Sequence, residues 1–187
     1  MKRVVVAGIA GAGKSTTAQR VADVLRVPYY ELDGFYEGPN WTLLEDYKER
    51  ISEALATDSW VTDSIFYPPD IDQMLLDRAD TVVWLDLPRP VVMRRVAWRT
   101  LQRGLPPRPV LVNGNKERLW AALLPSSPLR TAWREHGEYR ARLAAALADR
   151  TVQVIHLRSA AELDAWLAHL PMSEVKDSAV RDDVRGG

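Results

Sequence analysis

The chain contains no cysteine, which excludes disulfide bonds and thiolate metal sites. It also has no long hydrophobic run, because no apolar stretch approaches the roughly 20 residues that span a membrane. Its three histidines, His136, His156 and His169, lie far apart without metal-ligand spacing, and we expect surface or helix-packing roles for them. A strand-like stretch begins directly after Met1, which argues against a cleavable signal peptide. We therefore expect a cytoplasmic protein with no membrane partner.

A chain of 187 residues with 47% hydrophobic content is large enough for one domain with a substantial core. We expect that domain to span residues 1–171. Residues 172–187 contain few large apolar side chains and mixed charge, which predicts a flexible tail.

The net charge is zero, but acids and bases are separated along the chain. From Glu31 to Asp86 there are fourteen acids and three bases, whereas from Pro88 to Arg118 there are seven arginines, one lysine and one glutamate. Nucleic-acid-binding domains are more often basic overall, so we do not expect a nucleic-acid partner. A kinase needs a local separation of charge, with cations beside the phosphates and acids beside the group that is phosphorylated. Alternatively, the acidic and basic stretches form two solvent-exposed faces of opposite charge.

Residues 8–16 match the phosphate-binding pattern G-x-x-x-x-G-K-[ST] in its expected setting. An apolar strand is predicted at 2–7 and an amphipathic helix at 14–26. Glycines let backbone N–H groups approach phosphate oxygens, and the helix start adds its positive dipole end. Lys14 can reach the β- and γ-phosphates, and the Ser15 hydroxyl can ligate Mg²⁺. The residues assigned to the triphosphate are Gly8, Gly11, Ala12, Gly13, Lys14, Ser15 and Thr16.

Strand and helix patterns alternate along the rest of the chain, which predicts an α/β fold with a doubly wound five-stranded parallel sheet. Thr42-x-x-Glu45 has the pattern of a capping box and predicts a helix start. Ligands in such folds bind at the carboxyl ends of the strands, where Asp33, Asp63 and Asp86 also occur. The later strands are expected at 29–32, 59–62, 81–85 and 151–157, and the later helices at 42–55, 69–78, 90–103, 116–124, 127–149 and 160–170.

The P-loop, the sequence Asp33-Gly34-Phe35-Tyr36 and the arginine-rich helix after the fourth strand resemble the P-loop nucleoside and nucleotide kinase superfamily. Residues 32–41, 58–61, 78–86 and the turn 113–115 resemble a group of small adenylate-kinase-like proteins more closely. Some members of that group are described as DNA topology modulation proteins. The resemblance covers about residues 2–170 and implies a P-loop NTPase fold of the kinase type that uses ATP and Mg²⁺.

The resemblance also implies roles for single residues. Asp33 is similar to the aspartate of the uridine-kinase Asp-x-Phe-Tyr, which faces the acceptor hydroxyl and the Mg²⁺ shell; the alternative is a turn-forming Asp-Gly. Arg95-x-x-x-Arg99 resembles the R-x-x-x-R at the lid of adenylate kinases, and guanidinium groups bind phosphate oxygens. Arg99 is the first candidate, followed by Arg95, Arg103 and Arg108. Residues 104–116 resemble a lid, although the run of prolines makes it shorter than that of true adenylate kinases.

Other side chains are candidates for the acceptor. Asp63 is expected to bind the acceptor or a metal-bound water, and Tyr36 and Trp41 are expected to contact the acceptor. Packing in the core is the alternative for the aromatic pair. We expect Asp86 to cap and shape its turn. Trp98, Trp120 and Trp133 are expected to pack in the interior.

The leading hypothesis is an ATP-dependent kinase that transfers the γ-phosphoryl group to a hydroxyl or phosphate of a nucleoside- or nucleotide-like small molecule. We expect a monomer or homodimer. The alternative is a nucleotide-binding regulatory NTPase that acts through a partner such as nucleic acid. A GTPase is not expected, because no Asn-Lys-x-Asp sequence is present.

Overall fold

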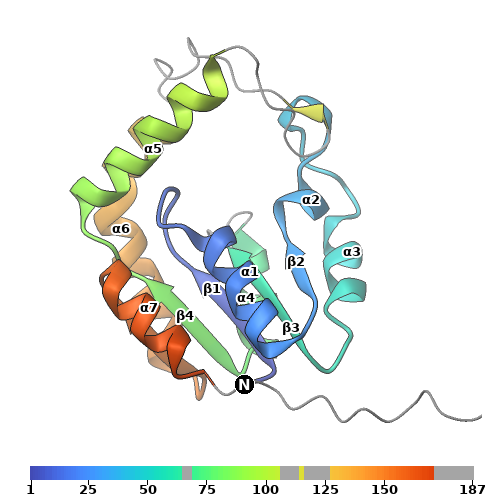
Figure 1. Ribbon diagram of the computed structural model, residues 1–187. Helices are drawn as coiled ribbons and strands as arrows, with labels where there is room; N and C mark the ends of the chain where they lie inside the picture. The colour runs from blue at the N-terminus through green and yellow to red at the C-terminus, as the bar shows by residue number, and fades with distance from the viewer. Residues whose placement is uncertain (65–68, 106–113, 116–126, 171–187) are drawn as a thin grey trace, which may run out of the picture.

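The computed structural model describes residues 1–64, 69–105, 114–115 and 127–170. Five parallel strands form one sheet in the order β2-β3-β1-β4-β5 (Figure 1). The strands are β1 (Arg3–Ala7), β2 (Tyr29–Glu31), β3 (Trp60–Ser64), β4 (Thr81–Leu85) and β5 (Gln153–Leu157). This arrangement confirms the expected doubly wound parallel sheet.

The centre of the sheet forms the core of the molecule. Val4, Val5 and Val6 of β1 are fully buried, and β4 is buried along its whole length. Such continuous apolar strands are typical of a parallel sheet that is covered on both faces. Since β1 pairs with β3 on one side and β4 on the other, its carboxyl end opens at the middle of the sheet edge.

Helices surround the sheet, with α1 and α4 at its centre, α2 and α3 beside β2, and α5, α6 and α7 near β4 (Figure 1). Helix α1 contacts β1, β2 and β3, while α5 lies along α6 and α7 contacts β5. The helices are α1 (Lys14–Leu25), α2 (Asp33–Tyr36), α3 (Tyr47–Ala54), α4 (Pro69–Arg78), α5 (Arg89–Gly104), α6 (Pro128–Ala148) and α7 (Ala160–Ala168), with a 3-10 turn η1 (Pro39–Trp41).

Two helices, α6 and α7, begin close to the positions expected from the sequence, whereas α3 begins later than expected. The Ser127 and Ser159 hydroxyls accept hydrogen bonds from the N–H groups of the first turns of α6 and α7. The capping box predicted at Thr42 is wrong, because α3 begins only at Tyr47. The preceding segment instead folds back on α2, where Leu43 bridges Glu37 as an antiparallel pair.

Asp86 was expected to cap and shape its turn, and the structure shows that its side chain contacts two other elements. Its buried carboxylate accepts hydrogen bonds from His156 Nε2 at 2.9 Å and from Arg140 Nε at 2.8 Å. The His156 ring stacks on Trp84 with centroids 4.3 Å apart. Asp86 therefore joins the end of β4 to β5, the edge strand on that side of the sheet, and to α6.

The predicted interior positions of two tryptophans are also wrong, since Trp98 is 60% exposed and Trp133 is 58% exposed. Several other predictions fall outside the described residues: the helix at 116–124 with Trp120, most of the lid-like segment with Arg108, and the tail at 172–187. Among the described residues, no helix is long and apolar enough to cross a membrane.

Candidate functional site

The P-loop connects the end of β1 to the start of α1. Gly11 has φ +86° and Gly13 has φ +96°, a backbone region that side chains rarely tolerate. A Cβ at Gly11 would lie 2.4 Å from Val96 Cγ2 of α5, so glycine is also required by packing. The Ala12 N–H donates to the Ile9 carbonyl at 3.0 Å, which closes the turn. The loop therefore presents the N-terminus of α1 to an anion.

Lys14 lies where the charges of the site converge. Burial lowers the pKa of Lys14 to about 8, against the opposing effects of Asp63 and Asp33, and the nearby Arg99 lowers it further. All four residues were separate candidates in the sequence, and they lie on four different elements: α1, α2, β3 and α5. The fold brings their charges close enough to interact.

Asp63 contacts the P-loop directly. Its Oδ2 accepts a hydrogen bond from the Ser15 hydroxyl at 2.7 Å, and its Oδ1 accepts one from the Tyr29 hydroxyl at 3.0 Å. Burial raises the pKa of Asp63, although Ser15, Lys14 and Tyr29 all favour the ionised form. Tyr29 was missed by sequence reasoning, since only the pairing of β2 with β3 reveals its position.

The pair of Ser15 and Asp63 suits Mg²⁺ chemically, because both offer hard oxygen ligands beside the phosphate-binding loop. The described part of the chain holds no group of three or more His, Cys, Asp or Glu that could bind a metal alone.

Asp33 opens the short helix α2 at the end of β2 and is exposed. The Tyr36 hydroxyl donates a hydrogen bond of 2.5 Å to Asp33 Oδ1. Burial and the adjacent Asp33 raise the pKa of Tyr36, so its hydroxyl keeps its proton. Tyr36 thus holds the Asp33 carboxylate in one orientation, with one oxygen engaged.

Two further acids flank Asp33 and were missed from the sequence. The pKa of Glu37 is raised to about 7 by burial and by the charges of Asp33 and Glu31. The pKa of Glu31 is raised by burial and by Asp63 and Asp33. Arg103 of α5 opposes both shifts. The acidic run was visible in the sequence, but its convergence on one place requires the β2–β3 register and the fold of α2.

Three of the five arginines of α5 were candidates for phosphate binding, and they make different contacts. The Arg95 guanidinium donates from Nη1 to the Ala12 carbonyl at 3.0 Å, which anchors α5 to the P-loop. Arg99 lies close enough to Lys14 for its charge to lower the pKa of that lysine. Arg103 lies near Glu31 and Glu37 instead. Phosphate binding by each of them remains a prediction.

A cavity of about 320 Å³ adjoins the P-loop on the side away from these acids. Its walls come from the start of α1, the end of β4 and the start of α7, with the Arg20–Asp164 ion pair of 2.9 Å at its border. The lining residues are Ala12, Gly13, Thr16, Thr17, Arg20, Leu85, Leu87, Arg95, Ser159, Ala160, Leu163 and Asp164.

The loop after α2 is held in a strained shape by a distant residue. Asn40 and Trp41 have φ of +56° and +61°, left-handed values that asparagine adopts readily but tryptophan rarely. The buried Asn115 side chain donates to the Gly38 carbonyl at 3.1 Å and accepts from the Trp41 N–H at 3.3 Å. Trp41 is left 49% exposed. Backbone strain of this kind concentrates at ligand-binding sites, and Asn115 was not a sequence candidate.

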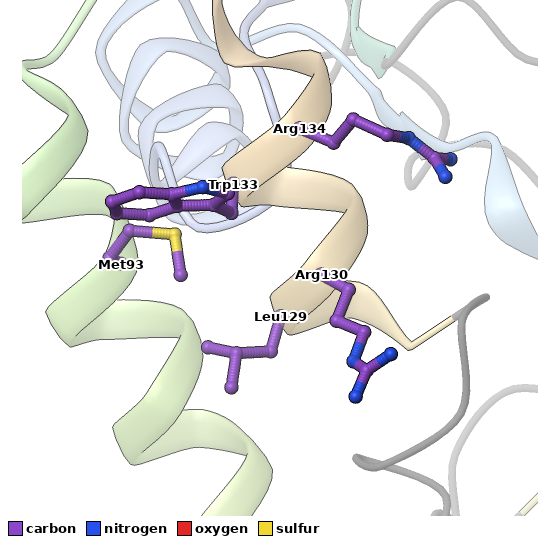
Figure 2. A pocket seen from close by; sticks show the side chains of 5 residues that line it. All are labelled: Met93, Leu129, Arg130, Trp133 and Arg134. Atoms are coloured by element: carbon purple, nitrogen blue, oxygen red, sulfur yellow. The ribbon is translucent and has the colours of Figure 1, made fainter.

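A second cavity, of about 510 Å³, lies between α5 and α6 (Figure 2). Met93 projects from α5, and the other lining residues project from α6. None of its lining residues belongs to the P-loop. They are Met93, Leu129, Arg130, Trp133 and Arg134.

The sequence matches no family model and no curated protein. Its fold is nevertheless similar to solved kinases. A shikimate kinase from Bacteroides thetaiotaomicron has a TM-score of 0.55 at 18% identity, covering 89% of this chain and 94% of that one. A gluconokinase from Sinorhizobium meliloti has a TM-score of 0.50 at 21% identity, covering 89% and 91%. A sugar kinase from a Janibacter species has a TM-score of 0.50 at 18% identity, covering 90% and 93%. The likeness establishes the P-loop kinase fold.

Proposed function

We propose that this protein is an ATP-dependent kinase that phosphorylates a hydroxyl or phosphate group of a small molecule. The observation that carries the proposal is the convergence of Lys14, Ser15 and Asp63 on the P-loop, with Asp33 close enough to interact with Lys14. A loop that only binds nucleotide needs no additional carboxylate on the acceptor side. A kinase needs one to orient the acceptor.

The P-loop amides and Lys14 would hold the β- and γ-phosphates, with Arg99 on the same side. The Ser15 hydroxyl and the Asp63 carboxylate would hold Mg²⁺, which would supply positive charge against the triphosphate. The cavity beside Arg95 and Ser159 is large enough to take the nucleotide base.

Asp33 is placed to act on the acceptor. The acceptor hydroxyl oxygen attacks the γ-phosphorus, its proton passes to the free oxygen of Asp33, and the bond from the γ-phosphorus to the bridging oxygen breaks. ADP leaves with that electron pair. A phosphate acceptor arrives already deprotonated and needs Asp33 for orientation alone.

The finer predictions belong to this proposal. The nearest relatives would be the small adenylate-kinase-like proteins, with residues 1–171 as the kinase domain, 104–116 as a lid-like insertion and 172–187 as a tail. Tyr36 and Trp41 would contact the acceptor, and the protein would act in the cytoplasm as a monomer or homodimer.

The test is a phosphoryl-transfer panel with Mg²⁺ and ATP, in which nucleosides, nucleoside monophosphates, sugars and amino alcohols are offered as acceptors. The expected result is transfer of the γ-phosphoryl group to one chemical class, detected as a new phosphorylated product beside ADP. Lys14→Ala should abolish the product. ATP binding with ADP formation but no phosphorylated acceptor would point to a hydrolase instead.

One observation favours the alternative, a regulatory NTPase that acts through nucleic acid. The exposed Trp133 lines the second cavity together with Arg130 and Arg134 (Figure 2). The Arg89 guanidinium also lies over the Trp133 ring, 5.1 Å from its centroid. Aromatic rings with guanidinium groups bind single-stranded nucleic acid by stacking and charge. Salt-sensitive binding of a DNA oligonucleotide that changes ATP turnover, and that Trp133→Ala removes, would support that function.

A further inference from the structure

The buried Asp63 carboxylate is held at both of its oxygens. Oδ2 accepts a hydrogen bond of 2.7 Å from the Ser15 hydroxyl of the P-loop, and Oδ1 accepts one of 3.0 Å from the Tyr29 hydroxyl of β2. Rotation of the carboxylate about its last side-chain bond would break these hydrogen bonds, and a buried polar group that loses its partner is costly. The two hydroxyls therefore fix the plane of the carboxylate.

The register of β2 with β3 places Tyr29 for this contact. Tyr29 pairs with Val61, and Glu31 pairs with Asp63, so Tyr29 lies one step before Asp63 on the same face of the sheet. Diagonal neighbours on one face of a sheet are within reach of an aromatic side chain. The Tyr29 hydroxyl thus approaches Asp63 from the edge strand, whereas the Ser15 hydroxyl approaches it from the P-loop.

The Tyr29 hydroxyl is the donor in this pair. Burial and the adjacent Asp63 raise the pKa of Tyr29, so the phenol keeps its proton. An ionised carboxylate has no proton to donate and has about four lone-pair positions on its two oxygens. The hydrogen bonds from Ser15 and Tyr29 use one position on each oxygen. The same carboxylate can therefore still accept bonds from a hydrated metal ion.

A purely structural role for Tyr29 is the alternative, because β2 is a three-residue edge strand. A second side-chain hydrogen bond joins the same two strands, in which the Thr62 hydroxyl donates to the Tyr30 carbonyl at 2.7 Å. Adjacent residues of a strand point to opposite faces, so Thr62 lies on the other face of the sheet from Asp63. Thr62 therefore allows the strand-pairing role to be tested separately.

We infer that Tyr29 is a positioning residue that acts through Asp63, since its hydroxyl holds the carboxylate in the orientation that binds Mg²⁺ together with Ser15. This inference rests on the proposed function, because it assigns Tyr29 to the metal site of that kinase. Residues that hydrogen-bond to metal ligands orient those ligands, and their loss typically lowers metal affinity by about 10- to 100-fold. In this role Tyr29 contacts neither the phosphates nor the acceptor. Its loss should therefore reduce the part of nucleotide affinity that depends on the metal.

The experiment compares nucleotide binding by the full chain with and without Mg²⁺. The probe is an ATP analogue with a β,γ-imido bridge, which is not hydrolysed, and it is titrated calorimetrically in Mg²⁺ or in EDTA. Tyr29→Phe removes only the hydroxyl, and it should weaken binding in Mg²⁺ by about tenfold while leaving binding in EDTA unchanged. Thr62→Val is the matched control, because it also removes a hydrogen bond between β2 and β3. It should leave both affinities at the wild-type values.

A second comparison tests whether Tyr29 acts through Asp63. If it does, Tyr29→Phe should have no further effect in a chain that already carries Asp63→Ala, because the carboxylate that Tyr29 holds is gone. Sites that act independently would give additive losses instead. If Tyr29→Phe fails to fold, Tyr29→Leu takes its place, since it also lacks the hydroxyl.

The outcomes distinguish this inference from the proposed kinase. An equal loss of affinity in Mg²⁺ and in EDTA, or the same loss in Thr62→Val, would assign Tyr29 to strand pairing and overturn the inference. Wild-type affinity of Tyr29→Phe in Mg²⁺, or additive losses in the double variant, would also overturn it. Each of these results would leave the kinase standing. If the wild type binds the analogue in neither condition, both proposals fail together.

Discussion

The Ser15 hydroxyl of the P-loop donates a hydrogen bond of 2.7 Å to the Asp63 carboxylate at the end of β3. This bond joins the start of α1 to a strand that lies next to β1 in the sheet and 48 residues away in the sequence. It also sets one hydroxyl and one carboxylate beside the place where the phosphates are expected. We therefore propose that Asp63 serves the metal shell more directly than the acceptor.

The first prediction concerns this pair. Asp63→Asn keeps the size of the side chain but removes the charge beside Ser15, so it should lower Mg²⁺ affinity or kcat by about 10- to 100-fold, the usual effect of losing a residue that orients metal ligands. The measurement is a Mg²⁺ titration of ATP turnover. Asp23→Asn, an exposed acid on α1, is the control. An unchanged Mg²⁺ dependence would remove Asp63 from the metal site.

The second prediction concerns pH and Lys14, whose pKa is lowered to about 8 by burial. The protonated amine binds phosphate, and phosphate binding raises its pKa. ATP affinity should therefore be constant below pH 8 and weaken above it, by up to about tenfold per pH unit. Lys14→Arg keeps its charge over this range, so its profile should stay flat. Isothermal titration of ATP from pH 6.5 to 9.5 measures both profiles, and parallel curves would contradict the assignment.

The P-loop, α1 and the sheet could be predicted because local signals and tertiary structure agree there. The glycine pattern at 8–16 predicts a turn between a strand and a helix. The apolar run of β1 predicts a strand that is buried in the core. The helix start predicted at Thr42 was wrong because this segment forms an antiparallel bridge between Glu37 and Leu43 instead. No local sequence signal predicts that bridge. The expected burial of Trp98 and Trp133 was also wrong, since a hydrophobic residue on a helix is buried only if another element covers that face.

The site was predicted in part for the same reason. Asp33 and Asp63 follow strands, so the general rule for parallel sheets placed them at the right edge. Tyr29, Glu31 and Glu37 required the register of β2 with β3 and the turn of α2. The role of Asn115 could not be predicted, because its hydrogen bond to Trp41 joins residues 74 positions apart in the sequence.

The third prediction tests whether the negative charge of Glu37 lowers the stability of the folded chain. The folded-state pKa of Glu37 is raised to about 7 from a usual value of 4.5, so its carboxyl is bound to a proton more tightly in the folded chain. Stability contributed by the protonated form is present below pH 4.5 and is lost as the pH rises through 7.

Glu37→Gln should therefore leave the melting temperature unchanged near pH 4 and raise it above pH 7 by a few degrees, about the effect of 1 kcal/mol in a chain of this size. Thermal denaturation across that range measures the difference, with Glu49→Gln as the control. A variant that melts lower than the wild type at pH 8 would show that Arg103 and Glu37 stabilise the fold.

The last prediction separates a kinase from a regulatory NTPase. Asp33→Asn keeps the size of the side chain and its hydrogen bond to Tyr36 but removes the negative charge. ATP should bind normally, because the P-loop supplies those contacts, while transfer falls by about a hundredfold or more, the typical effect of losing a general base. Steady-state kinetics with the acceptor found in the panel, together with ATP affinity, measure both.

Arg99→Ala provides the comparison for Asp33→Asn, because Arg99 lies close enough to Lys14 to lower its pKa and is the first candidate for binding phosphate. Its loss should lower kcat by removing charge stabilisation from the transition state, and KM for ATP should rise if the ground-state phosphate is also bound. Asp33→Asn should change kcat without that rise. Full transfer by Asp33→Asn would refute its catalytic role. If DNA alters ATP turnover while no acceptor is phosphorylated, the regulatory NTPase is the better assignment.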